Sequence, residues 1–159
     1  MSTNDHIRAM IKYNYALYRR VWESIAYLSD EQFVQEIDYS HGSIRNHVVH
    51  VATVDGRWLR GLQELPTARQ FNLNPSDYVT RESARAAWEA TAQDVADYVA
   101  SLDDAGLERQ PQGMYGPVWQ VLAHMVNHGT DHRAQILRAL HDLGAPTFDQ
   151  DLILYLWRR

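Results

Sequence analysis

The stretch His124-Met125-Val126-Asn127-His128-Gly129-Thr130-Asp131-His132-Arg133-Ala134-Gln135 places three histidines four residues apart in a segment with helical periodicity. On an α-helix, residues four apart lie on the same face, one turn from each other. Two imidazoles in this arrangement can bind one zinc or other divalent first-row ion, and a third ligand from elsewhere leaves one coordination position for water or substrate. The stretch therefore predicts a metal site inside a helical protein.

The helix that carries these histidines extends outward in both directions. It opens at Gly116-Pro117, with proline at the first helical position, and ends at Leu143, where Gly144 follows. A helical wheel places His132 inside the apolar stripe, His128 at its edge and His124 about 110° from its centre. Along the axis about 12 Å separates His124 from His132, too far for two bonds of about 2.0–2.1 Å to one zinc ion. The predicted ligand pair is His128 and His132, and His124 is interpreted as a surface residue or a neighbour of the ligands.

Three further long segments and one short segment show the apolar spacing of amphipathic helices. The long ones cover residues 3–28, ending near Ser29-Asp30, residues 44–62 after a Ser43 cap, and residues 81–102 after a Thr80 cap; the short one covers residues 152–157. Four long helices without a strand pattern predict an all-α fold, a four-helix bundle with a short C-terminal helical segment docked on it. The link of residues 63–79 is either a crossover or a loop that covers one end of the bundle.

Composition limits the classes of protein to consider. A chain of 159 residues with 45% hydrophobic residues and no composition shift is expected to form one domain, residues 1–159. The absence of cysteine excludes thiolate ligands and disulfides and fits a cytoplasmic protein. No segment approaches the roughly 20 apolar residues of a membrane span, and no secretory signal pattern opens the chain. A formal net charge of −5 without a basic cluster argues against nucleic acid as a partner.

The third metal ligand must come from another helix. The segment after Ser43 offers His47 and His50, and the wheel places His47 nearer the centre of the apolar face. Periodicity by itself therefore favours His47 over His50.

The chain also resembles a known family along nearly its whole length. The motifs that carry the resemblance are Tyr13-Asn14, Leu28-Ser29-Asp30-Glu31-Gln32-Phe33, Ser43-Ile44-Arg45 followed by His50, Arg57-Trp58-Leu59, residues 127–135, Leu143-Gly144-Ala145-Pro146-Thr147, Asp151 and Tyr155-Leu156. In their order and spacing they are similar to the DinB/YfiT-like superfamily. The resemblance implies a four-helix bundle, commonly a homodimer, with one divalent metal ion bound by His50, His128 and His132. It selects His50 over His47, against the wheel.

Other residues are candidates for roles around the metal. Asp55 falls on the apolar face of its helix, where it can orient a ligand imidazole, pair with Arg133, or make a structural hydrogen bond to Asn14 or a helix N-terminus. Arg133 and Gln135 belong to the family motif and can serve helix packing, a dimer or the reaction. His47 and His124 are further neighbours of the site. Trp58, Trp119, Tyr115 and Met114 can wall a pocket, with its mouth at residues 112–116.

The predicted metal site together with the family resemblance implies a metal-dependent enzyme that acts on a small-molecule substrate; its relatives suggest a hydrolase or a thiol-dependent transferase. The alternative is a non-catalytic metal-binding or stress-response protein with a structural metal. Zinc or nickel is the expected ion, iron and manganese also accept imidazole ligands, and a low-molecular-weight thiol is a candidate second cofactor.

Overall fold

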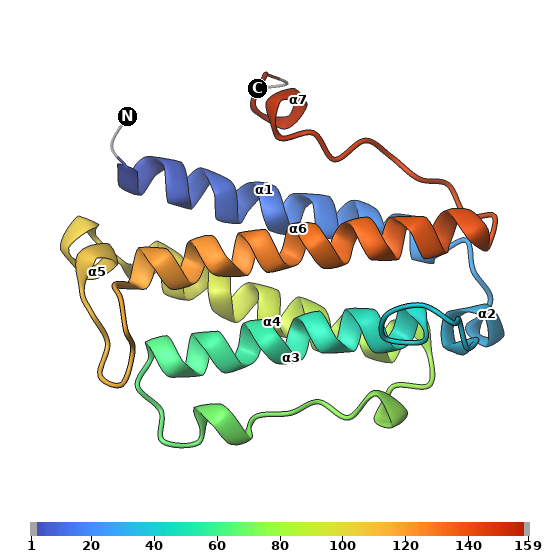
Figure 1. Ribbon diagram of the computed structural model, residues 1–159, viewed down its shortest axis with the longest axis horizontal. Helices are drawn as coiled ribbons and strands as arrows, with labels where there is room; N and C mark the ends of the chain where they lie inside the picture. Colours follow the sequence, from blue (N-terminus) through green and yellow to red (C-terminus); the bar gives the residue numbers. More distant parts are fainter. Residues whose placement is uncertain (1–2, 158–159) are drawn as a thin grey trace.

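Four long helices form the body of the computed structural model, which describes residues 3–157. They are α1 (Thr3–Ile25), α3 (Ile44–Leu62), α4 (Arg81–Ser101) and α6 (Val118–Asp142) (Figure 1). Shorter elements connect or follow them: α2 (Asp30–Val34), the 3-10 helices η1 (Ala68–Gln70) and η2 (Pro75–Asp77), α5 (Asp104–Glu108) and α7 (Leu152–Trp157). The described residues contain no strand, so the predicted all-α bundle is confirmed.

The ends of the long helices are set by the capping residues that the sequence offers. The Ser43 hydroxyl accepts a hydrogen bond from the Asn46 amide at the start of α3, and Thr80 caps α4 in the same way through the Ser83 amide. Gly144 takes a φ of +79° after α6, and the amides of Gly144 and Ala145 donate to the carbonyls of His141 and Leu140. This pair of bonds is a Schellman motif, which needs a residue that tolerates positive φ.

Three details differ from the sequence prediction. Helix α1 ends at Ile25, three residues before Leu28, and α6 begins at Val118 with Pro117 as its N-cap. The short helices α2 and α5 were not predicted. Helix α2 has a capping box in which Ser29 and Gln32 bond each other's backbone, so the Ser29-Asp30 pair that marks the end of the predicted first helix also begins a new one. Asp103 caps α5 through the Gly106 amide.

The link between α3 and α4 is a crossover that runs back along α3, so α3 and α4 point the same way (Figure 1). It stays in contact with α3 throughout: the Arg57 Nε donates to the Phe71 carbonyl, and the Leu73 amide donates to the Thr53 hydroxyl. A Cβ on Gly56 would lie 2.4 Å from the Phe71 ring, so glycine allows this close approach. Helices α1 and α6 also point the same way, antiparallel to α3 and α4.

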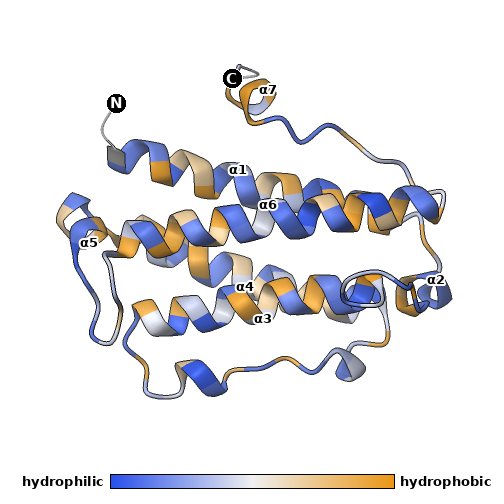
Figure 2. Cartoon of the chain, viewed as in Figure 1, coloured by the Kyte–Doolittle hydropathy of each residue, from blue (hydrophilic) through white to orange (hydrophobic). Residues whose placement is uncertain are grey.

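The hydrophobic faces of the four helices meet in one core (Figure 2). Its largest fully buried side chains include Trp22 from α1, Phe33 from α2 and Trp88 from α4. Helix α7 packs on α1, where the ring centroids of Tyr155 and Tyr13 are 5.4 Å apart. Within residues 3–157, no helix is both long and hydrophobic enough to cross a membrane.

Candidate metal centre

His50, His128 and His132 come together between α3 and α6. The two helices run antiparallel, so the second turn of α3 faces the middle of α6 (Figure 1). One ring nitrogen from each of the three histidines lies within 4.8 Å of the others. The predicted triad is therefore brought together as a group that could hold a metal ion, with two ligands from α6 and one from α3.

The separation of one pair of ring nitrogens, from His50 and His128, matches that of two ligands on a tetrahedral ion. The Nε2 atoms of His50 and His128 are 3.3 Å apart. Two nitrogens that each lie about 2.0–2.1 Å from one ion at the tetrahedral angle are separated by about 3.3 Å. The ring centroids of His128 and His132 are 4.3 Å apart, and those of His50 and His132 are 4.7 Å apart. The imidazoles are thus close to the separation that ligation requires.

The surroundings keep these imidazoles neutral. Burial, together with the neighbouring histidines, lowers the pKa of His50 to about 3 and that of His128 to about 4. The pKa of His132 is also lowered, chiefly by burial. Since only the neutral imidazole has a free lone pair for a metal, the fold favours the form that ligates. In the part of the chain that the structure describes, the buried Nδ1 atoms of His128 and His132 have no hydrogen-bond partner.

Three more histidines surround the triad. His47 is almost fully buried, with 1% of its surface exposed, as its central position on the wheel predicted. His124 is exposed and lies outside the triad, and its ring contacts those of Trp58 and His128 at 5.1 and 5.9 Å. His41 was missed by the sequence analysis because it lies in a loop without periodicity. Its ring stacks on that of His50 at 4.0 Å.

Asp55 is buried, and its hydrogen bond differs from those predicted for it. Its Oδ2 accepts a hydrogen bond of 2.7 Å from the Tyr15 hydroxyl, and its Oδ1 has no partner among the described residues. The predictions that Asp55 pairs with Arg133, bonds to Asn14 or directly orients one of the three imidazoles are therefore wrong. Burial raises the pKa of Asp55 to about 7, against the lowering effect of the bond from Tyr15.

Arg133 is a packing residue on the other side of α6. It is fully buried, and its guanidinium donates to Asn14 Oδ1 at 2.6 Å, Gln150 Oε1 at 3.0 Å and Thr130 Oγ1 at 3.1 Å. It also lies over the rings of Tyr13 and Tyr18. These contacts join α6 to α1 and to the segment before α7.

Gln135 holds the loop that carries His41. Its Oε1 accepts a hydrogen bond of 2.6 Å from the Ser40 hydroxyl, and its Nε2 donates to Asp131 Oδ2 at 3.1 Å. Of the two motif residues, Gln135 is therefore the one connected to the surroundings of the histidines.

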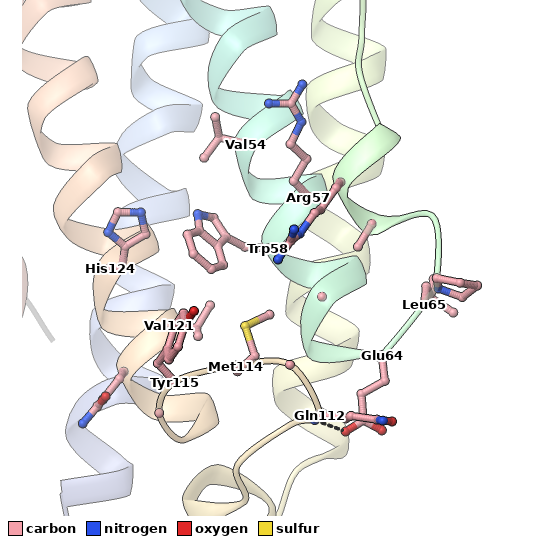
Figure 3. Close-up of a pocket in the computed structure, with 17 residues that line it drawn as sticks. Val54, Arg57, Trp58, Glu64, Leu65, Gln112, Met114, Tyr115, Val121 and His124 are labelled. Carbon is pink, nitrogen blue, oxygen red and sulfur yellow. Dashed lines mark hydrogen bonds between the residues drawn. The ribbon is translucent and has the colours of Figure 1, made fainter.

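A cavity of about 870 Å³ lies between α3, the crossover and the start of α6 (Figure 3). Trp58, Met114 and Tyr115 line it, as predicted, whereas Trp119 packs against the core instead. Val54 and His124 line the cavity too, one helical turn from His50 and His128. The wall of the cavity thus comes within one helical turn of His50 and His128, which are not among its lining residues.

Comparison with known proteins agrees with this architecture. The family model described as the DinB family matches residues 1–159. A search among curated proteins found no match.

Proposed function

Since the chain belongs to the DinB family, we propose that it is a divalent-metal-dependent enzyme, a hydrolase or a thiol-dependent transferase, with His50, His128 and His132 as ligands. The observation that carries the proposal is the convergence of three neutral imidazoles one helical turn from a cavity large enough for a small molecule. A bound cation would supply a Lewis acid that activates water or a thiol as a nucleophile. Zinc or nickel is the ion we expect.

The cavity residues suit a small substrate with an apolar part and an anionic group. The half-buried Trp58 and Met114 offer apolar surface, the exposed Tyr115 lies at the mouth, and Arg57 and Arg69 place positive charge along one side. Arg57 is oriented by its bonds to the Phe71 carbonyl and to Asn72 Oδ1. His124 stands between the cavity and His128, where it can contact a substrate that reaches the metal.

The test is to follow the coordination of a cobalt-loaded protein purified without a histidine tag. Adding cysteine or glutathione should produce a thiolate charge-transfer band in the near ultraviolet if a thiol enters the open position. Trp58→Ala should weaken the response to a substrate analogue, while His141→Ala, on the same helix as the ligands but exposed, should leave it unchanged. A cobalt spectrum that responds to no thiol, together with no hydrolysis of test esters or amides, would overturn the proposal.

One observation favours the alternative of a non-catalytic metal site. Ligating histidines normally donate their second nitrogen to a carboxylate, a carbonyl or water, which orients them. The Nδ1 atoms of His128 and His132 have no such partner among the described residues. In this alternative the ion stabilises the packing of α3 against α6, and its removal lowers the unfolding temperature while the cobalt spectrum stays unchanged on adding any ligand.

A further inference from the structure

A second group of three histidines shares His132 with the first. One ring nitrogen each from His41, His47 and His132 lies within 4.8 Å of the others. The ring centroid of His41 lies 5.0 Å from the ring centroid of His47 and 5.1 Å from that of His132. The ring centroids of His47 and His132 are 6.0 Å apart. The group joins the first turn of α3, the middle of α6 and the loop before α3.

Two of these three side chains are buried with a ring nitrogen that has no partner. His47 is 1% exposed and His132 is 7% exposed, and no described residue makes a hydrogen bond to the buried Nδ1 atom of either. Burying a polar atom without a partner costs free energy, so such atoms in a native protein usually have a ligand or water. A cation held by one nitrogen from each ring is a ligand of this kind, and a buried Nδ1 that makes no hydrogen bond within the described residues is available to bind it.

The third side chain, His41, is held in place by its own loop. The Asn46 side-chain amide donates to the His41 carbonyl at 2.9 Å, and the preceding residue, Ser40, is bonded to Gln135 on α6. Gly42, at a φ of +82°, donates to the Tyr39 carbonyl and accepts from the Ile37 amide, which closes the loop. His41 is therefore tied to both helices that carry the other two histidines.

We propose that His41, His47 and His132 form a second position for a divalent first-row cation, alternative to the one at His50, His128 and His132. A neutral imidazole has one lone pair for a metal, so His132 serves one ion at a time. The two positions exclude each other, and each protomer holds one ion. The second position binds more weakly because one ligand comes from a loop instead of a helix. The proposal of this second position does not depend on whether the first position is catalytic.

The test disables the first group and leaves the second intact. The double variant His50→Ala/His128→Ala is titrated with Co²⁺ alone, and bound metal per protomer is measured by equilibrium dialysis and elemental analysis. We expect it to take up one ion with a higher dissociation constant than the wild type. Adding His41→Ala or His47→Ala should abolish this uptake, and adding His141→Ala should not change it. The wild type should bind one ion in total.

Several outcomes would overturn the proposal. They are a folded double variant that takes up no Co²⁺, uptake that survives the addition of both His41→Ala and His47→Ala, or two ions in the wild type. Circular dichroism and urea unfolding establish whether the double variant is folded. If it is not, His50→Phe and His128→Phe, which keep an aromatic ring but no ligand atom, replace the alanine changes in the same comparison.

Discussion

His132 and Arg133 are adjacent in sequence, yet they serve two polar clusters of opposite character on the two sides of α6. On the α1 side, the nitrogens of Arg133 all donate to oxygens or lie near tyrosine rings. On the α3 side, the buried Nδ1 atoms of His47, His128 and His132 have no hydrogen-bond partner within residues 3–157. The Arg133 cluster is held together by hydrogen bonds within the chain, although the Nδ2 atom of Asn14 has no partner among the described residues. The histidine cluster instead brings ring nitrogens from three side chains within 4.8 Å of one another, as expected for residues that bind something from outside the chain.

The largest effect should come from replacing the shared ligand. His132→Ala removes a ligand from both groups and should abolish metal retained after dialysis against a chelator. His50→Ala and His128→Ala should each lower metal affinity by more than the roughly 10–100-fold typical of losing an outer partner. His124→Ala and His47→Ala should retain the ion. Loss of metal in His124→Ala with retention in His132→Ala, measured by elemental analysis, would mean that the ligand pair lies one turn earlier.

Replacing Arg133 in the cluster on the α1 side should lower stability and leave metal binding unchanged. Arg133→Met leaves Asn14 Oδ1 and Gln150 Oε1 without a donor, so we expect a loss of about 2–4 kcal/mol in the free energy of unfolding. Metal content per folded protomer should not change. Urea unfolding in the presence of chelator measures the loss. Arg138→Met, on an exposed turn of the same helix, should alter stability by no more than about 0.5 kcal/mol. A variant at Arg133 that loses metal but not stability would make Arg133 part of the metal site.

A smaller effect should follow from crowding the structural cluster. A Cβ on Gly129 would lie 2.4 Å from Asn14 Oδ1, and Asn14 is held there by Arg133. Gly129→Ala should therefore destabilise by about 1–3 kcal/mol, as overpacking does. At Gly61 the added Cβ would meet only the terminal methyl of Met114, which can move aside. Gly61→Ala should leave stability unchanged or raise it slightly. Thermal unfolding of both variants measures the difference, and equal losses of stability in Gly129→Ala and Gly61→Ala would contradict this explanation.

The smallest effect should be the pH dependence of the metal-free protein, because two contributions oppose each other. The pKa values of His47 and His128 are about 4 in the folded protein, below the usual 6.5, so the unfolded chain binds protons first as pH falls. Their contribution to stability is present above pH 6.5 and is lost between pH 6.5 and 4. Asp55, with a raised pKa of about 7, acts in the other direction, because the folded state keeps its proton up to that pH.

We expect the histidines to outweigh Asp55, since they are more numerous. The urea midpoint of the metal-free protein should therefore fall from pH 7 to pH 5. Asp55→Asn removes the opposing contribution and should steepen that fall. A midpoint that rises on acidification in both proteins would show that the histidines are not held neutral by the fold.

The bundle and the pair of histidines on α6 could be predicted because both depend on local periodicity. Apolar spacing located the four long helices to within a few residues, and Ser43, Thr80 and Gly144 marked three of their ends. The spacing of His128 and His132 placed both on the inward face of α6. Family resemblance indicates His50, whereas the wheel favours the more deeply buried His47, because a helical wheel reports burial and does not report which side chain of another helix lies opposite.

What the tertiary structure decided is which side chains from different segments meet. Nothing local distinguishes His41 from a solvated loop histidine, and only the packing of its loop on Gln135 brings it to His47 and His132. The direction of the crossover and the partner of Asp55 were likewise open, since each depends on contacts between residues far apart in the chain. Residue spacing along one helix determines which residues share a face, but the residue opposite that face is set by how the helices pack.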